Sequence, residues 1–341
     1  MKKILKEVVG VDVDQKKLVV SLGRLHEDLE QEIYAHKVFD NNATGFPALL
    51  SWVSNLADPG VETCFVMEAT GVYHESFAYF LDENGKVVSI VLPNKISNYF
   101  RTLEIKTITD KSSSEAIASF GLSRKLSRWK KPDPTFKKLK QLSREREQLI
   151  VERTLVKNQL HAENAEAEPL KASLQRMERR ITLLTKQEKE ILQEMKLLIA
   201  SNEKINAQVK LACTVPGVGI LTSAIVLAET NGFEHVKNKR QLVSYAGLDV
   251  REKQSGTSVK GKPRISKRGN RYLRKAMYLP ALAAIRSNEQ HRDIFARLVG
   301  RHGIKMKAAV AIQRKILELI YVLIKNNTVY NEHHLKLVHA A

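Results

Sequence analysis

VVGVDVDQKKLVVSL, residues 8–22, decides the fold of the first part of this chain. Two runs of β-branched and apolar residues flank the polar stretch Asp14-Gln15-Lys16-Lys17, which predicts a β-hairpin with its turn at 14–17. The alternating residues 31–39 predict a third strand. VETCFVM at 61–67 is almost wholly apolar, the pattern of a strand buried on both faces.

Helices are expected between and after these strands, near 43–57 and 72–83, with a further strand at 86–92. A β-meander that continues into β-α-β units predicts a mixed α/β sheet, and this order suits an RNase H-like fold. We therefore expect four parts: an α/β domain over residues 1–130, a helical or coiled-coil linker over 131–205, a mostly α-helical domain over 206–330, and a tail over 331–341.

The composition indicates a nucleic-acid partner. The 341 residues carry a formal net charge of +19, and self-repulsion of that size is typical of proteins that bind phosphate backbones. The two cysteines, Cys64 and Cys213, lie in apolar runs and indicate buried thiols of a reducing compartment. With no secretory leader and no run of 18 apolar residues, the expectation is a cytoplasmic, nucleoid-associated protein with no membrane segment.

The stretch 135–205 is highly charged and lacks glycine, and it breaks at HAENAEAEP, which ends in Pro169. Apolar residues of its second half fit the a and d positions of one heptad frame, with Glu188 as the one misfit among them: Leu170, Leu174, Met177, Ile181, Leu184, Ile191, Met195 and Leu198. Two interpretations stay open, a helical hairpin within the chain and a coiled coil that pairs protomers.

Three acids stand where a buried sheet presents its functional groups. Asp12 lies in the first strand between two valines, where an acid is costly unless it is paired or binds a metal. Glu68 follows the apolar strand 61–67, at the end where α/β sheets place their sites. Asp110 begins a helix, where an isolated acid is usually a first-turn residue. If an RNase H-like fold brings the three together, they form an oxygen-rich site for Mg²⁺ or Mn²⁺.

The segment 251–275 has ten Lys or Arg residues against one acid, Glu252. This density is typical of a loop that follows phosphates, and we expect nucleic-acid contacts from Lys260, Lys262, Arg264, Lys267, Arg268, Asn270, Arg271 and Arg274. A serine among these cations is well placed to attack a phosphodiester, with a carboxylate or a metal-bound hydroxide as proton acceptor. The residues alone do not choose among Ser255, Ser258 and Ser266. Gly269-Asn270 predicts the start of a helix over 271–286.

These motifs together resemble the DEDD transposases of insertion-sequence family one-ten, relatives of the Piv DNA invertases. GVDVDQKK, VMEATGVYHE and KTITDKSSSEAIA are similar to the three acidic motifs of that family. VPGVG and the long pattern SG…RISKRGN…LR are similar to its C-terminal transposase domain. The resemblance keeps the order of parts over nearly the whole chain.

The resemblance implies a RuvC-like domain in which Asp12, Glu68 and Asp110 bind the metal. It implies Ser255 as the nucleophile that forms a covalent phosphoserine link to DNA, in a composite site shared between subunits of a dimer or tetramer. DNA partners would be the element ends and a target. A structured guide RNA is implied as well, because at least some members use one.

One position departs from the family pattern. The fourth acid usually stands three residues after the third, and here that position is Ser113. On a helix, Ser113 and Ser114 share the face of Asp110, whereas Glu115 points aside. The fourth site position is therefore expected to be Ser113, through its hydroxyl or a water, or Asp14.

Three other functions compete with recombination. A structure-selective junction nuclease would use the carboxylates alone. A sugar-kinase or actin-like ATPase needs a Gly/Ser/Thr-rich phosphate turn after the first acid, which Gln15-Lys16-Lys17 does not provide. A non-catalytic packaging protein explains the charge but not acids on buried strands.

Overall fold

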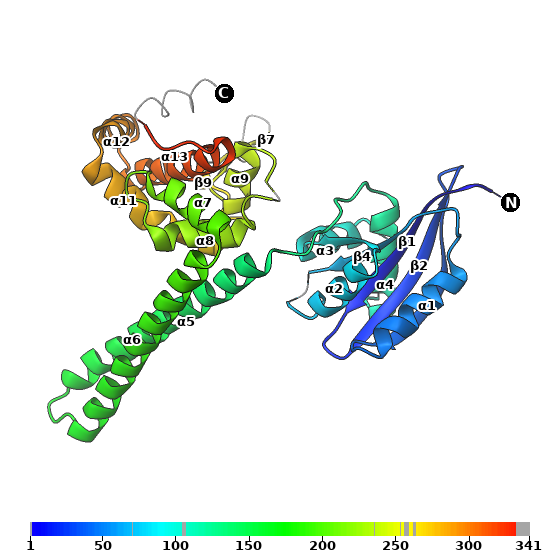
Figure 1. Ribbon diagram of the computed structural model, residues 1–341, viewed down its shortest axis with the longest axis horizontal. Helices are drawn as coiled ribbons and strands as arrows, with labels where there is room; N and C mark the ends of the chain where they lie inside the picture. The colour runs from blue at the N-terminus through cyan, green and yellow to red at the C-terminus, as the bar shows by residue number, and fades with distance from the viewer. Residues whose placement is uncertain are drawn as a thin grey trace. The chain divides into compact units, whose positions relative to one another are not determined.

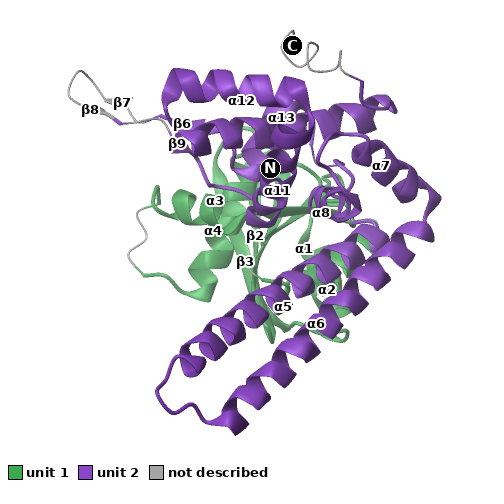
Figure 2. Ribbon diagram, turned by 90° about the vertical axis from the view of Figure 1, so that its left-hand side faces the viewer, with its two compact units in different colours: residues 1–131 green, residues 132–341 purple. Residues whose placement is uncertain are grey.

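The computed structural model describes residues 2–69, 71–103, 107–234, 236–252, 254–255, 259–261 and 264–331. The chain divides into two compact units, Met1–Lys131 and Pro132–Ala341 (Figure 2), and each is described by itself. Of the predicted tail, only Asn331 lies within the described residues.

The first unit is built on one five-stranded sheet of order β3-β2-β1-β4-β5. Only β2 runs antiparallel to the other strands, since β1 and β4 are parallel, as are β4 and β5. This is the strand arrangement of RNase H-like folds, and it confirms the mixed α/β sheet that the sequence predicted. The strands are β1 (Ile4–Val13), β2 (Lys17–His26), β3 (Gln31–Asp40), β4 (Thr63–Glu68) and β5 (Val87–Val91).

Alternation along β1 divides the core between the two faces of the sheet. Val9, Val11 and Val13 belong to the larger core, which is covered by α1 (Gly45–Leu56) and α2 (Glu75–Glu83). Val8 belongs to the smaller core under α3 (Pro93–Phe100) and α4 (Asp110–Leu122). Since side chains alternate, Gly10 and Asp12 share the face of Val8.

Helix α4 lies unusually close to β1. A β-carbon on Gly10 would meet the backbone oxygen of Ser114 at 2.4 Å, so only glycine allows this approach. The Ser114 hydroxyl lies 2.7 Å from that of Ser21 on β2. The Lys6 ammonium donates to the carbonyl of Gly121 at 2.5 Å, at the other end of the helix. These contacts fix the position of α4 along the strand.

The second unit begins with two long helices, α5 (Pro134–Asn164) and α6 (Lys171–Ala200), which run side by side as a hairpin (Figure 1). Of the two interpretations of the heptads, the structure agrees with the helical hairpin within the chain. Ile191 and Met195 are buried in the core of this unit, whereas Leu170 caps the start of α6 and is 64% exposed. Glu188, the misfit, is buried and paired with Arg146 and Arg153.

Helices make up most of the remaining described chain, as the sequence predicted. They are α7 (Glu203–Cys213), α8 (Ile220–Thr230), α9 (Lys239–Ala246), α10 (Arg271–Ala276), α11 (Tyr278–Ser287), α12 (Glu289–His302) and α13 (Lys305–Asn326). Between α9 and α10 lie four two-residue strands, which pair β6 (Val250–Arg251) with β9 (Arg264–Ile265) and β7 (Gln254–Ser255) with β8 (Val259–Lys260). No helix in the described parts is long and apolar enough to cross a bilayer.

The single helix predicted over 271–286 is wrong in one respect, because it is interrupted at Met277 and forms α10 and α11. Pro280 gives the physical reason. It has no N–H to donate to the carbonyl of Ala276, and its ring would clash with that carbonyl in a continuous helix.

Candidate active site

Two of the predicted acids lie at neighbouring strand ends. Val11 on β1 pairs with Met67 on β4. Asp12 is the residue after Val11 and Glu68 is the residue after Met67, so the two acids lie side by side at the carboxyl ends of two parallel strands. Val66 and Val8 belong to the core under α3 and α4, and alternation puts Glu68 and Asp12 on that same face. The register of the sheet therefore brings the two acids together.

The third acid comes from the helix that covers this face. Asp110 is the first residue of α4, whose start is fixed by a capping box between Thr109 and Ser112. Asp110 precedes the buried Ser114 by one helical turn, so both lie on the side of α4 that meets β1. The close approach at Gly10 thus carries Asp110 toward Asp12.

The site opens into a cleft of about 740 Å³. Asp12, Glu68 and Ser113 line it on one part of its wall, and α3 with the residues after it supplies the rest: Pro93, Asn94, Ile96, Ser97, Phe100, Arg101, Leu103 and Ile108. The position where the family pattern has its fourth acid, Ser113, therefore faces the same space as two of the acids.

Burial, and after it repulsion from the carboxylates of Asp110 and Glu68, raises the pKa of Asp12 to about 6. This repulsion indicates that Asp110 and Glu68 lie near Asp12. Within the described residues, no group of three or more His, Cys, Asp or Glu side chains is placed so that it could hold a metal ion as it stands. The donors nevertheless fit a hard divalent cation, which relieves such repulsion and commonly completes its shell with water and substrate phosphate.

The other candidates for the fourth position are occupied elsewhere. Asp14 is exposed in the hairpin turn, where its carboxylate accepts the backbone N–H of Lys16 at 3.3 Å. Hydrogen bonds from the Gln15 and Lys16 backbone lower the pKa of Asp14. Ser114 is fully buried against Ser21, and Glu115 pairs with Lys111 at 3.9 Å. Ser113 is the position that the geometry favours.

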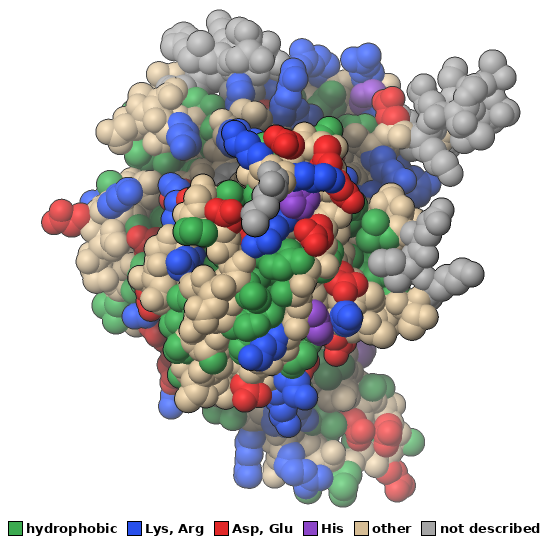
Figure 3. All heavy atoms as spheres, turned by 90° about the vertical axis from the view of Figure 1, so that its right-hand side faces the viewer, with side chains coloured by type: hydrophobic (Ala, Val, Ile, Leu, Met, Phe, Trp, Pro, Cys, Tyr) green, Lys and Arg blue, Asp and Glu red, His purple; other side chains and the backbone are tan. Residues whose placement is uncertain are grey.

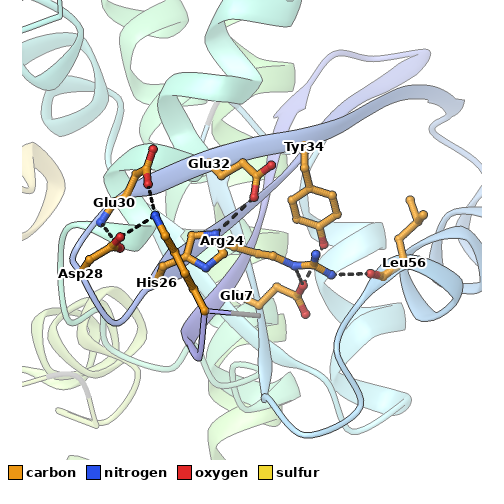
Figure 4. Close-up of polar contacts among 9 residues, drawn as sticks. Glu7, Arg24, His26, Asp28, Glu30, Glu32, Tyr34 and Leu56 are labelled. Atoms are coloured by element: carbon orange, nitrogen blue, oxygen red, sulfur yellow. Dashed lines mark hydrogen bonds and ion pairs between the residues drawn. The ribbon is translucent and has the colours of Figure 1, made fainter.

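Another acid of β1, the buried Glu7, has a structural role that no pattern in the sequence indicates. Its carboxylate is fully buried and accepts hydrogen bonds from Arg24 Nε at 2.9 Å and from the Tyr34 hydroxyl at 2.8 Å (Figure 4). The Asp58 N–H and the Thr63 hydroxyl complete its partners. Glu7 lies five residues before Asp12 on β1 and on the other face of the sheet, and protein groups already bind its carboxylate.

The basic segment of the second unit is described only in part. Ser255 lies in β7 and Lys260 in β8, and their side chains lie outside the described residues, as do Ser258 and Lys262 altogether. The third candidate serine, Ser266, donates from its hydroxyl to Asp249 at 2.5 Å and accepts the N–H of Arg268. Ser266 therefore stabilises a turn.

The predicted nucleic-acid contacts divide into exposed and structural residues. Arg264, Lys267, Arg268 and Arg271 are exposed. Asn270 instead caps α10 through the N–H groups of Tyr272 and Leu273, and its amide donates to the buried carboxylate of Glu229 at 2.6 Å. That carboxylate also accepts from Arg144.

Arg274 is half-buried and donates to the carbonyl of Ala246 at 2.8 Å. Asn270 and Arg274 therefore fix the position of α10, the helix that carries the exposed Arg271. The sequence around these residues does not reveal which of them are structural, because the partners Glu229 and Ala246 are distant in sequence.

Charge is distributed unequally between the units. Residues 1–131 contain 17 Lys or Arg and 17 Asp or Glu, whereas residues 132–341 contain 39 and 20, so the second unit carries the whole excess of +19. On the face drawn in Figure 3, basic and acidic side chains are interspersed. Non-specific attraction of phosphate backbones therefore belongs to the second unit.

Two family models match the chain. The model for the transposase IS116/IS110/IS902 family matches residues 209–296, and a transposase model of the DEDD type of IS110 matches residues 9–163. The pilin gene-inverting protein of Moraxella bovis is 28% identical over 295 residues, which is 86% of this chain and 90% of that protein. The transposase of insertion element IS1111A from Coxiella burnetii is 31% identical over 133 residues, 37% of this chain and 35% of that protein.

Among solved structures, Thermus thermophilus RuvC in complex with a Holliday junction substrate matches 36% of this chain and 99% of its own, with 10% identity and a TM-score of 0.27. The site, the order of the units and the matched families define a DNA recombinase of the transposase class. The chain belongs to the IS110 family of transposases.

Proposed function

We propose that the protein cleaves and rejoins DNA strands to move an insertion sequence, with Asp12, Glu68 and Asp110 as metal ligands and Ser255 as nucleophile. The observation that carries the proposal is the pairing of β1 with β4, which puts Asp12 and Glu68 at neighbouring strand ends in an open cleft, where burial and then repulsion from Asp110 and Glu68 raise the pKa of Asp12 to about 6. Partly buried acids that repel one another are unfavourable for folding unless a cation binds them. Mg²⁺ is the expected ion, with Mn²⁺ as a substitute.

The proposed reaction forms one P–O bond for each P–O bond that it breaks, so it needs neither water nor a nucleotide cofactor. The Ser255 Oγ forms a bond to phosphorus while one P–O bond to deoxyribose breaks, and the sugar leaves as a hydroxyl. The serine proton passes to a carboxylate of the cluster, which returns it to the leaving oxygen. Attack by the hydroxyl of the new strand reverses these steps and releases Ser255. The bound metal would stabilise the charge that develops on the phosphate oxygens.

The remaining basic and apolar side chains support the proposed partners. The exposed Arg264, Lys267, Arg268 and Arg271, together with Lys260 and Lys262, would bind backbone phosphates of the element ends and the target. A structured guide RNA would use the same basic unit, and the protein would act on nucleoid DNA. Exposed apolar residues on the helical hairpin, Val151, Leu155 and Leu183, favour a homo-oligomer, dimer or tetramer, with a composite site between subunits.

Adduct trapping tests the proposal. Full-length protein is incubated with Mg²⁺ and an element-end duplex nicked beside the cleavage position, so that the short product diffuses away and a covalent adduct remains on a denaturing gel. The wild type and the control Ser258→Ala should form the adduct, whereas Ser255→Ala and Asp12→Ala should not. Metal-dependent cleavage by Ser255→Ala at the wild-type rate, with no adduct from any protein, would replace the proposal with a RuvC-like junction nuclease.

A further inference from the structure

Helix α3 presents a polar face to the cleft that holds the acids. Asn94, Ser97 and Arg101 line this cleft, and their spacing of three and then four residues puts them on one side of a helix. The other side packs into the core through the edge-on contact of Tyr99 with Phe120. Ile96, which is 3% exposed, lies between the two sides: it belongs to the same core and also borders the cleft. The orientation of α3 is thus fixed by burial, and its polar face is left to the cleft.

These three side chains are free to bind a ligand. All three residues are exposed, and in the part of the chain that the structure describes none of their side chains has a hydrogen-bond or ion-pair partner. Arg101 is also the one cation among the described residues that line the cleft. An amide, a hydroxyl and a guanidinium are the donors that proteins use to hold backbone phosphates.

The charge balance of the first unit favours such a contact. This unit has equal numbers of basic and acidic residues, and its cleft contains acids that repel a phosphate. A bound metal would neutralise the acids at the scissile phosphate only. A neighbouring phosphate of the same strand needs its own positive partner, and Arg101 is the cation that lines the cleft among the described residues.

We propose that Asn94, Ser97 and Arg101, the α3 face, bind a backbone phosphate next to the scissile one and so hold the DNA strand against the carboxylates. This inference rests on the proposed function and adds a strand-positioning site to it. Arg101 supplies the charge-assisted hydrogen bonds, and Asn94 and Ser97 set the register of the strand along the helix.

Single neutral linkages in the DNA test this directly. Each phosphate flanking the cleavage position is replaced in turn by a methylphosphonate, and single-turnover cleavage is measured for the wild type, Arg101→Ala and the control Lys95→Ala. Lys95 lies on the same helix but does not line the cleft. Arg101→Ala should slow cleavage about ten- to a hundredfold, whereas Lys95→Ala should cleave like the wild type.

The decisive result is non-additivity at one position. There, the methylphosphonate should slow the wild type and Lys95→Ala but should have no further effect on Arg101→Ala, because the partner of that phosphate is already gone. Additive effects at every position, or equal rates for Arg101→Ala and Lys95→Ala, would overturn the inference while leaving the carboxylate site intact. Wild-type cleavage by Asp12→Ala would instead refute the proposed function itself.

Discussion

A β-carbon on Gly10 of β1 would lie 2.4 Å from the backbone nitrogen of Ala118 on α4. This closeness holds Asp110 near Asp12. We expect Gly10→Ala to push α4 outward, to lower the free energy of unfolding by about 1–3 kcal/mol and to reduce metal-dependent cleavage more than the loss of folded protein explains. The control is Gly300→Ala, whose added carbon meets nothing within 4 Å. Equal cleavage by both variants would contradict this role of Gly10.

The raised pKa of Asp12 predicts how stability depends on pH. In the metal-free protein the folded state holds the Asp12 proton up to about pH 6, above the ordinary value of 3.8. The protonated Asp12 therefore contributes fully to the free energy of unfolding below pH 3.8, and this contribution is lost as the pH rises to about 6. Asp12→Asn should be more stable than the wild type at pH 7, on the order of 1 kcal/mol after solvent screening, and equal to it below pH 4.

Denaturant unfolding of the wild type and Asp12→Asn across this pH range, without metal, makes the comparison. Added Mg²⁺ should stabilise the wild type at pH 7 and lose that effect as the pH falls through about 6. A Mg²⁺ effect of the same size in Asp12→Asn would place the ion elsewhere.

Ser113 lines the cleft at the position where the family pattern has an acid. Ser113→Asp should add a carboxylate oxygen to the site and tighten Mg²⁺ or Mn²⁺ binding about five- to tenfold. Titration calorimetry with the metal alone measures this, and Ser113→Asn serves as the neutral control. Affinity that is unchanged in Ser113→Asp would remove this position from the metal site.

In the basic segment, different residues should serve DNA binding and the stability of the fold. Replacing the exposed Arg268 and Arg271 by alanine should weaken binding to all DNA sequences and flatten the slope of log K against log salt by about 2, with an unchanged melting temperature. Arg274→Ala removes the hydrogen bond to Ala246, so it should lower the melting temperature and leave the slope nearly unchanged. A lower melting temperature without Arg268 and Arg271, together with a flatter salt slope without Arg274, would contradict this division of roles.

Glu7 supports the sheet that carries the site. Glu7→Ala leaves Arg24 and the Tyr34 hydroxyl without their buried partner and should lower the free energy of unfolding by about 3–5 kcal/mol. Glu30→Gln, which loses only an exposed pair with Lys2, should leave unfolding unchanged. Chemical denaturation of both variants measures the difference, and similar midpoints would show that the Glu7 network adds no stability.

The first unit could be predicted well because its signals are local. Alternation in β1 and β2 and the apolar strand β4 each specify a short element, and their succession predicts a mixed α/β sheet. The position of α4 on β1 could not be predicted, since it depends on the contact of Gly10 with Ser114 and Ala118, far apart in sequence. That contact decides whether Asp110 reaches Asp12.

Other parts of the site depended on partners that no spacing reveals. Glu7 stood among strand residues without any motif, and its role became evident only from Arg24 and Tyr34. Asn270 was grouped with the cations beside it, but it holds the buried Glu229. Whether Glu188 interrupted a coiled coil or completed an ion-pair cluster depended likewise on Arg146 and Arg153 of the preceding helix.

Sulfur substitution at the scissile phosphate tests most directly whether the acids and Ser255 act on one phosphate. Formation of the covalent adduct by the wild-type protein is timed on an element-end duplex with a single phosphorothioate at the cleaved linkage, in Mg²⁺ and in Mn²⁺. A strong slowing in Mg²⁺ that Mn²⁺ largely restores, with the adduct mapped to Ser255 by mass spectrometry, is the predicted result. The same modest sulfur effect in both ions, or an adduct on another residue, would contradict it.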